Sequence, residues 1–399
     1  MRVTGSWERA ARGAMLLGAD GQLRQTIFGE MSALAASTGA INLGQGFPDE
    51  DGPIEVLDAA RRAITDGINQ YPPALGMPIL REAIAAHQER FYGVRVEADR
   101  QVLVTAGATE ALAATIMALT VEGDEVVTLE PFYDAYGAMI AYGRATHVTV
   151  PLRAPHFQPD HDDLRAAITD RTRLILINSP HNPTGSVLPR ATLELIIELA
   201  HEHDAIIVTD EVYEHLTFGV EHIPVSSLPG GFDRTVTISS GGKTFSTTGW
   251  KIGWIVAPEP LVQAILAVKQ YLTYVSGAPF QPAIAVGLGL SDEFFSSAAS
   301  TLERKCVILS AGLTKAGFTV STPQAGYFVI ADAAALGVTD AAEFCRTLPQ
   351  LAGVAAVPVS AFVHPDRRQG FETLLRFAFC KKVDLLERAA AQLAGLRLD

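Results

Sequence analysis

Lys243 is the residue in this sequence whose setting most strongly indicates chemistry. It follows an apolar, β-branched run (234–238) and stands among glycines and hydroxyl side chains. No lysine precedes it, and arginine carries the basic charge of the first 242 residues. Only a lysine amine can lose its proton and form an imine with an aldehyde, which an arginine guanidinium cannot do. Lys243 is therefore a candidate covalent attachment point, although an isolated lysine in a loop is more often a solvated charge.

Polar residues that suit an aromatic cofactor ring stand at the ends of other apolar runs. Asp210 ends such a run, and a partly buried carboxylate there needs a partner, either a protonated ring nitrogen or the first N–H groups of a helix. Asn182 and Tyr213 could bond a ring oxygen, and Tyr133 could stack on the ring face. The ordinary alternatives are a turn for Asn182 and core packing for Tyr133.

Two further features predict anion binding. Gly107, Ala108 and Thr109 open a helix directly after a strand, where free N–H groups favour a phosphate, although Thr109 could equally cap the helix. Ser240 and Lys251 could add a hydroxyl and a cation. Arg376 stands inside the apolar run 374–379, where a guanidinium must find an anion, either a substrate carboxylate or a structural ion pair.

Apolar runs alternate with helical patterns over most of the chain, which predicts an α/β fold with a mostly parallel sheet covered by helices. In such sheets the chemistry lies at the carboxyl ends of the strands, where these candidate residues fall. A helix is expected at 28–36 and a long one at 260–274, after which the pattern indicates a smaller α+β domain. We expect a poorly ordered lead-in at 1–24, a small domain from 25–50 and 293–399, and a large, cofactor-binding domain from 51–292.

Composition excludes several classes of protein. The formal net charge of the 399 residues is −13 with no basic block, so neither nucleic acid nor an anionic membrane is an expected partner. The three cysteines are widely spaced, and no secretory or membrane-spanning run occurs, so a reducing cytoplasm is expected. No metal site is expected: His201 and His203 diverge on a helix, and Gly242-Lys243-Thr244 lacks the leading glycine of a phosphate-binding P-loop.

The motifs together resemble the class I branch of the fold-type I pyridoxal-phosphate aminotransferases. The resemblance spans nearly the whole chain through the following segments: 42–48 (NLGQGFP), 69–72 (NQYP), 182–185 (NPTG), 210–213 (DEVY), 240–243 (SGGK) and Arg376. No single motif decides, but all of them in this order are specific.

The resemblance implies a pyridoxal 5'-phosphate cofactor and a role for each candidate residue. Lys243 would form the Schiff base, Asp210 would pair with the pyridine nitrogen, and Tyr213 would assist. The cofactor-binding set would be Gly107, Ala108, Thr109, Tyr133, Asn182, Asp210, Tyr213, Ser240, Lys243 and Lys251, with Tyr71 contributed across the interface of a homodimer. The substrate-binding set would be Gly46, Asn182, Arg376 and Phe28.

Within the class, the chain is most similar to the kynurenine, glutamine and methionine aminotransferase group, and there to actinobacterial N-succinyldiaminopimelate aminotransferases, notably at 130–134 and 269–280. Ser276-Gly277-Ala278 replaces bulkier residues of kynurenine-type enzymes and would admit a longer acceptor. The resemblance implies ping-pong transfer from glutamate to N-succinyl-2-amino-6-oxopimelate. A kynurenine, glutamine or methionine aminotransferase and a cysteine-conjugate β-lyase remain alternatives, while a regulator built on this fold is disfavoured by the complete catalytic set.

Overall fold

The structure, a computed structural model, describes residues 3–18 and 20–397. Its main element is an eight-stranded mixed sheet in which the central strands β3, β4, β6, β7 and β8 run parallel. Strands β9 and β5 run antiparallel to their neighbours. In spatial order the sheet contains β2 (Val102–Thr105), β9 (Gly253–Val256), β8 (Thr235–Ser240), β7 (Ile206–Asp210), β6 (Thr172–Asn178), β3 (Glu125–Glu130), β4 (Thr146–Arg153) and β5 (Gln158–Pro159).

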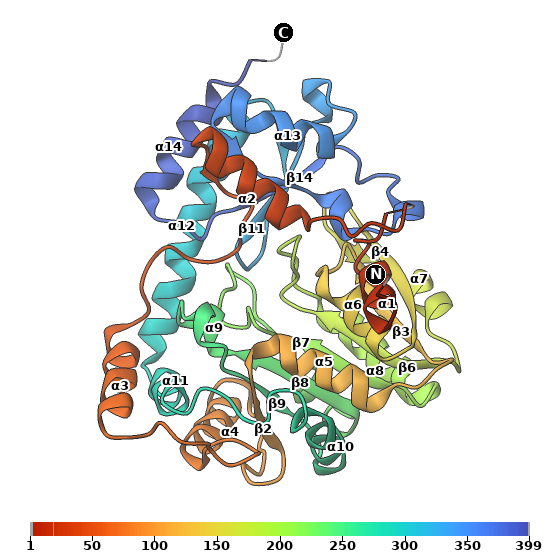
Figure 1. Ribbon diagram of the computed structural model, residues 1–399, viewed down its shortest axis with the longest axis vertical. Helices are drawn as coiled ribbons and strands as arrows, with labels where there is room; N and C mark the ends of the chain where they lie inside the picture. Colours follow the sequence, from red (N-terminus) through yellow and green to blue (C-terminus); the bar gives the residue numbers. More distant parts are fainter. Residues whose placement is uncertain (1–2, 19, 398–399) are drawn as a thin grey trace.

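The central strands are buried on both faces, which explains their continuous apolar sequences. Alternate residues of β6 serve opposite faces: Leu174 and Leu176 join the core beneath α5 (Gly107–Leu119) and α10 (Glu259–Lys269), whereas Ile175 joins the core beneath α8 (Arg190–Glu202). Other helices of this layer are α3 (Ile54–Thr65), α4 (Pro78–Tyr92), α6 (Ala135–Tyr142), α7 (His161–Ala167) and α11 (Phe280–Leu288). The mostly parallel sheet covered by helices, as predicted, is confirmed (Figure 1).

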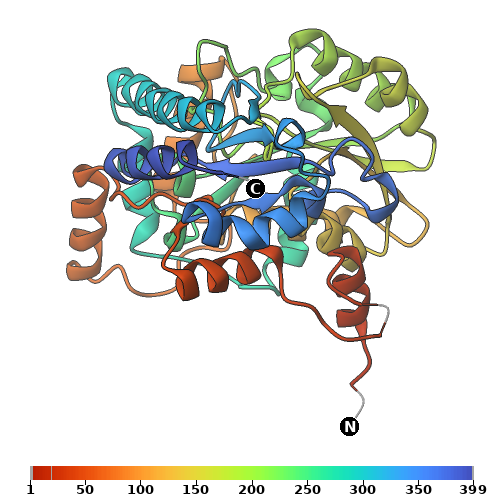
Figure 2. The same ribbon diagram turned by 90° about the horizontal axis from the view of Figure 1, so that it is seen from above.

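A second, smaller layer contains a four-stranded antiparallel sheet, which confirms the predicted α+β region. Its strands are β10 (Thr319–Val320), β11 (Phe328–Asp332), β14 (Leu374–Ala378) and β13 (Val357–Pro358), and a parallel pair joins β1 (Ile41–Asn42) to β12 (Val354–Ala355). The helices α2 (Ile27–Thr38), α12 (Asp292–Lys315), α13 (Ala341–Ala352) and α14 (Val383–Ala394) surround these strands (Figure 2). Segments from both ends of the chain therefore build one layer, which explains how α2 comes to lie beside the C-terminal strands.

The predicted poorly ordered lead-in at 1–24 is wrong for its described part. Helix α1 (Ser6–Gly13) packs on α6, and the two backbones approach so closely that a Cβ on Gly13 would lie 2.3 Å from the carbonyl oxygen of Gly137. The two glycines permit this contact, which has no periodic apolar signature. Met1, Arg2 and Ala19 lie outside the described residues.

The helix predicted at 260–274 is wrong at its end, because α10 stops at Lys269. The buried ammonium of Lys269 donates a hydrogen bond of 2.7 Å to the carbonyl oxygen of Tyr274, and Tyr274 has a φ of 64°. This bond closes a turn, so the chain leaves the helix axis. Among residues 3–18 and 20–397, no helix combines the length and apolarity that a membrane crossing requires.

Candidate active site

A cavity of about 190 Å³ opens at the carboxyl ends of β6, β7 and β8. Parallel strands end at one edge of the sheet, so the residues that follow them meet there. The lining includes every residue predicted to hold the cofactor in its own subunit: Gly107, Ala108, Thr109, Tyr133, Asn182, Asp210, Tyr213, Ser240, Lys243 and Lys251. The structure therefore gathers in one place residues that are spread over 145 positions of sequence, from 107 to 251.

Lys243 enters this cavity from α9 (Gly241–Thr244), a single helical turn that directly follows β8. Its Nζ donates a hydrogen bond of 3.1 Å to the carbonyl oxygen of Gly46 and lies 5.7 Å from the ring centroid of Tyr213. Burial lowers the pKa of Lys243, and the cations Arg376 and Lys251 act in the same direction, whereas Cys380 and Asp210 act in the opposite direction. A lowered pKa favours the neutral amine, the form that attacks a carbonyl.

Asp210 is the last residue of β7 and is almost fully buried. Its Oδ2 accepts a hydrogen bond of 2.7 Å from the hydroxyl of Tyr136, and its Oδ1 accepts one of 3.5 Å from the backbone N–H of Val212. Burial raises the pKa of Asp210 to about 6, although these hydrogen bonds and Lys243 act in the opposite direction. No Lys or Arg side chain among the described residues forms an ion pair with it, so a cation placed in the cavity would stabilise its charge.

The start of α5, where an anion cradle is expected, lines the cavity. No side chain caps this helix, so its first N–H groups have no capping acceptor, and Gly107, Ala108 and Thr109 line the cavity. The Nζ of Lys251 lies 3.4 Å from the Oγ1 of Thr109. Gly253 supports this geometry, since a Cβ there would lie 2.5 Å from the carbonyl carbon of Gly107.

Arg376 is buried in β14 beside this cavity, with its guanidinium bonded only to neutral oxygens among the described residues. It donates hydrogen bonds to the Oδ1 of Asn182 (3.0 Å) and to the carbonyl oxygen of Gly44 (2.9 Å), and its Nε has no partner in the described chain. Phe328 and Phe28 flank the guanidinium at 3.8 and 5.2 Å from their ring centroids. Burial lowers the pKa of Arg376 to about 10, so the group stays charged at neutral pH. A carboxylate is the ligand that this arrangement fits.

The other predicted substrate residues lie around the guanidinium of Arg376. Asn182 and Phe28 are near it directly, and Gly46 lies against Phe328, whose ring packs on the guanidinium. A Cβ on Gly46 would lie 2.2 Å from the Cζ of Phe328, so only glycine fits there.

Tyr71, predicted to contact the partner's cofactor, lies outside the cavity. It is 81% exposed and contacts Tyr274 edge-on at 5.4 Å between ring centroids.

Sequence reasoning missed two tyrosines that support the site. Tyr136 bonds Asp210, and the hydroxyl of Tyr327 donates a hydrogen bond of 2.6 Å to the carbonyl oxygen of Lys243. Tyr136 lies three residues after Tyr133, which precedes α6, and the two rings meet edge-on at 5.5 Å between centroids. This short spacing is the one signal that could have indicated Tyr136. Nothing in the sequence links Tyr327 to Lys243, because 84 residues separate them.

Comparison with known proteins decides the family. The model of the aminotransferase class I and II family matches residues 38–393. The chain belongs to this family. This aminotransferase is 48% identical over 380 residues to a probable N-succinyldiaminopimelate aminotransferase (DapC) of Mycobacterium tuberculosis, with 93% of this chain and 96% of the relative covered.

The structural similarity extends to the whole aminotransferase. The solved N-succinyldiaminopimelate aminotransferase of Mycobacterium tuberculosis superimposes with a TM-score of 0.93 at 46% identity, covering 99% of this chain and 100% of that one. A methionine aminotransferase of Escherichia coli is 40% identical over 377 residues, with 94% of this chain and 97% of the relative covered. The kynurenine–oxoglutarate transaminase 3 of Rattus norvegicus is 36% identical over 397 residues, covering 92% and 87%. The predicted resemblance to this group is confirmed.

Membership of the family implies pyridoxal phosphate, and the aminotransferase's own residues fit that group. The uncapped start of α5 with Lys251 suits a phosphate, and the buried Asp210 suits a protonated ring nitrogen. Lys243 lines the same cavity and supplies an amine for the aldehyde.

Proposed function

We propose that this aminotransferase holds pyridoxal 5'-phosphate in the 190 Å³ cavity and transfers amino groups in two half-reactions. The observation that supports this most strongly is the shared cavity of Lys243 and Asp210, with Arg376 reaching it through Asn182. When bound, the cofactor supplies an aldehyde that accepts the amino group and a conjugated ring that takes up electrons from the substrate Cα.

The chain's own residues supply binding and proton transfer. We infer that Lys243 would hold the cofactor aldehyde in the resting enzyme and, once the substrate amine had replaced it, would act as the general base that takes the proton from the substrate Cα. The lowered pKa of Lys243 supports this role. Arg376 would hold the substrate carboxylate and so fix the Cα within reach of Nζ, while Asp210 would keep the ring nitrogen protonated.

We propose N-succinyl-2-amino-6-oxopimelate as the amino acceptor and glutamate as the donor, in diaminopimelate and lysine biosynthesis. The support is similarity over nearly the whole chain to the Mycobacterium tuberculosis enzyme, at 48% identity in sequence and a TM-score of 0.93 in structure. Ser276, Gly277 and Ala278 are not part of the cavity lining in the single chain, so the substrate proposal rests on the similarity of the chain as a whole.

A second candidate function is an aminotransferase for methionine, kynurenine or glutamine. The relatives from Escherichia coli and Rattus norvegicus, at 40% and 36% identity, favour it. A cysteine-conjugate β-lyase would use the same Lys243 but would expel a sulfur group from Cβ of the substrate.

Half-reactions separate these functions. The holoenzyme is first mixed with each of a panel of amino donors, and the absorbance change of the cofactor is followed. The amino-loaded enzyme is then offered N-succinyl-2-amino-6-oxopimelate, the keto acid of methionine, and 2-oxoglutarate. We expect glutamate and the succinylated acceptor to give the highest kcat/KM values. Preference for methionine or kynurenine as donor would instead support the second candidate, and pyruvate with ammonia from a cysteine conjugate would support the lyase.

We further propose a cytoplasmic homodimer in which Tyr71 reaches the partner's cofactor phosphate. The exposure of Tyr71 and Tyr271, at 81% and 84%, supports an interface on that side of the single chain. The three buried free cysteines suit a reducing compartment. The domain boundaries at 25–50 with 293–399 and at 51–292 remain our proposal, supported by the two separate sheets.

A further inference from the structure

A second group of ionisable side chains lies outside the cofactor cavity. It borders a separate cavity of about 440 Å³ between the C-terminal end of α4, the segment 214–222 and the first turns of α12, and none of its lining residues is shared with the cofactor cavity. Four of its lining side chains are acidic and none is a lysine or arginine: Glu214, Glu221, Asp292 and Glu303. Arg90 lies nearby, but it is paired with Asp292. The cavity therefore favours a cation.

Three potential metal ligands meet beside this cavity, and two of them, Glu214 and His215, line it. The Nε2 atoms of His87 and His215 lie 2.6 Å apart, and the carboxylate of Glu214 completes a group whose ligand atoms all lie within 4.8 Å of one another. Imidazole nitrogen with one carboxylate oxygen is a ligand set that Zn²⁺ and similar divalent ions use. Two neutral imidazoles bonded to each other through Nε2 are the alternative. The buried Nδ1 of His87 has no partner in the described chain in either arrangement.

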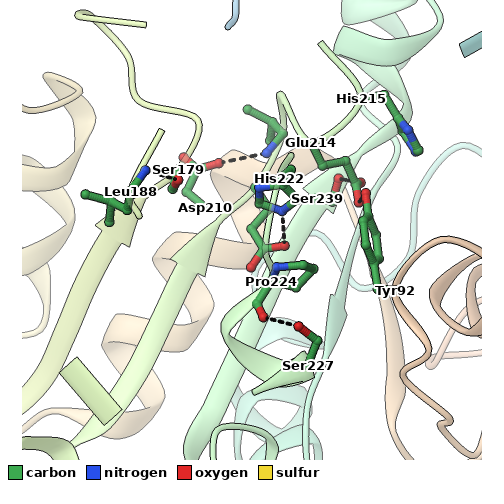
Figure 3. Close-up of polar contacts among 12 residues, drawn as sticks. Tyr92, Ser179, Leu188, Asp210, Glu214, His215, His222, Pro224, Ser227 and Ser239 are labelled. Atoms are coloured by element: carbon green, nitrogen blue, oxygen red, sulfur yellow. Dashed lines mark hydrogen bonds and ion pairs between the residues drawn. The ribbon is translucent and has the colours of Figure 1, made fainter. Parts of the chain in front are cut away.

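The surroundings of the three ligands hold them in place. The Oε2 of Glu214 accepts a hydrogen bond of 2.7 Å from Tyr92 and its Oε1 accepts one of 2.5 Å from Ser239, as Figure 3 shows. Such outer hydrogen bonds orient metal ligands, and an apolar shell around them controls the access of solvent. Phe295 supplies that shell, with its ring centroid 4.2 Å from that of His215.

We propose that His87, Glu214 and His215 form a binding site for one divalent transition-metal ion of the Zn²⁺ class. Both rings would carry their proton on Nδ1, and the ion would replace the hydrogen bond between the two Nε2 atoms. Remaining coordination positions would face the acidic cavity and take water. Glu214 directly follows Tyr213, so the ion would fasten the segment that carries Asp210 and Tyr213 to α4, which supplies His87.

Co²⁺ titration of the untagged holoenzyme after EDTA treatment and desalting tests the proposal. We expect a saturable visible absorption band at one equivalent per chain, lost on addition of one equivalent of Zn²⁺. His87→Gln and His215→Gln should each weaken Co²⁺ binding by about 100-fold or more. His201→Gln, at an exposed position, is the matched control and should bind as the wild type does.

Two results would overturn the proposal. The first is the absence of stoichiometric Co²⁺ binding by the wild-type holoenzyme, which needs no variant to interpret. The second is equal binding by the wild type and by both His87→Gln and His215→Gln, each shown to be folded by circular dichroism. Cofactor absorbance and turnover are recorded separately, because the proposed amino transfer does not depend on this ion.

Discussion

The hydroxyl of Tyr136 donates a hydrogen bond of 2.7 Å to the Oδ2 of Asp210, and both side chains are buried. This bond is one of the influences that limit the rise in the pKa of Asp210. The buried Tyr136 therefore influences the ionisation of Asp210, the residue that would face the cofactor ring.

Replacement of Tyr136 by Phe should raise the pKa of Asp210 above about 6, because burial is then less opposed. A hydrogen bond to a charged group contributes about 1.5–3 kcal/mol, so kcat/KM at pH 7 should fall by roughly 10-fold or more, and the acid limb of the pH profile should move to higher pH. Tyr142→Phe, at an exposed position on the same helix, is the control. An acid limb that stays in place in Tyr136→Phe would refute this role.

The cofactor-free protein should lose stability as pH rises through the window from about 4 to about 6. The carboxyl of Asp210 has a raised pKa in the folded chain, about 6 against an ordinary 3.8, so the folded state binds the proton more tightly than the unfolded state does. Above that window, the ionised carboxyl of Asp210 therefore lowers the free energy of unfolding by about 3 kcal/mol. Denaturant unfolding at several pH values should show a smaller decline in Asp210→Asn, and equal declines in the two proteins would contradict the assignment.

Replacement of Arg376 by Lys should weaken the capture of substrate carboxylates. The planar guanidinium already bonds Asn182 and Gly44 and lies against Phe328, an arrangement that an ammonium cannot reproduce. We expect kcat/KM for the amino donor to fall by roughly 100-fold, mainly through KM, which corresponds to about 2.7 kcal/mol. Arg388→Lys, on the exposed face of α14, should change nothing. An unchanged KM for Arg376→Lys would exclude a direct contact with the carboxylate.

Gly253→Ala should displace the start of α5, where the phosphate is proposed to bind. The added Cβ would lie 2.5 Å from the carbonyl carbon of Gly107, so the start of α5 must move. We expect a loss of about 1–3 kcal/mol of stability and weaker binding of pyridoxal phosphate, measured by thermal unfolding and by cofactor titration. Gly249→Ala, where a Cβ would meet nothing within 4 Å, should leave both quantities unchanged. Equal cofactor affinity in the two variants would argue against the cradle.

Several elements could be predicted from sequence because their signals are local. The helix expected to open at Gly107, Ala108 and Thr109 directly after a strand is found as α5, which begins at Gly107 and follows β2. Asp210 and Lys243 could be placed together because parallel strands end at one edge of a sheet. Packing between distant segments could not be predicted in this way. The close contact of Gly13 with Gly137, the bond from Tyr327 to Lys243, and the meeting of His87 with His215 each join residues with no shared period or spacing.

Borohydride reduction of the pyridoxal-phosphate-loaded protein, followed by peptide mapping, tests the central claim most directly. We expect the reduced cofactor on the peptide that contains Lys243, in the wild type and in Lys315→Ala, whose replaced lysine is exposed. Lys243→Ala should bind the cofactor without covalent retention after reduction. Cofactor fixed to another lysine in the wild type, or fixed equally in Lys243→Ala, would contradict the account.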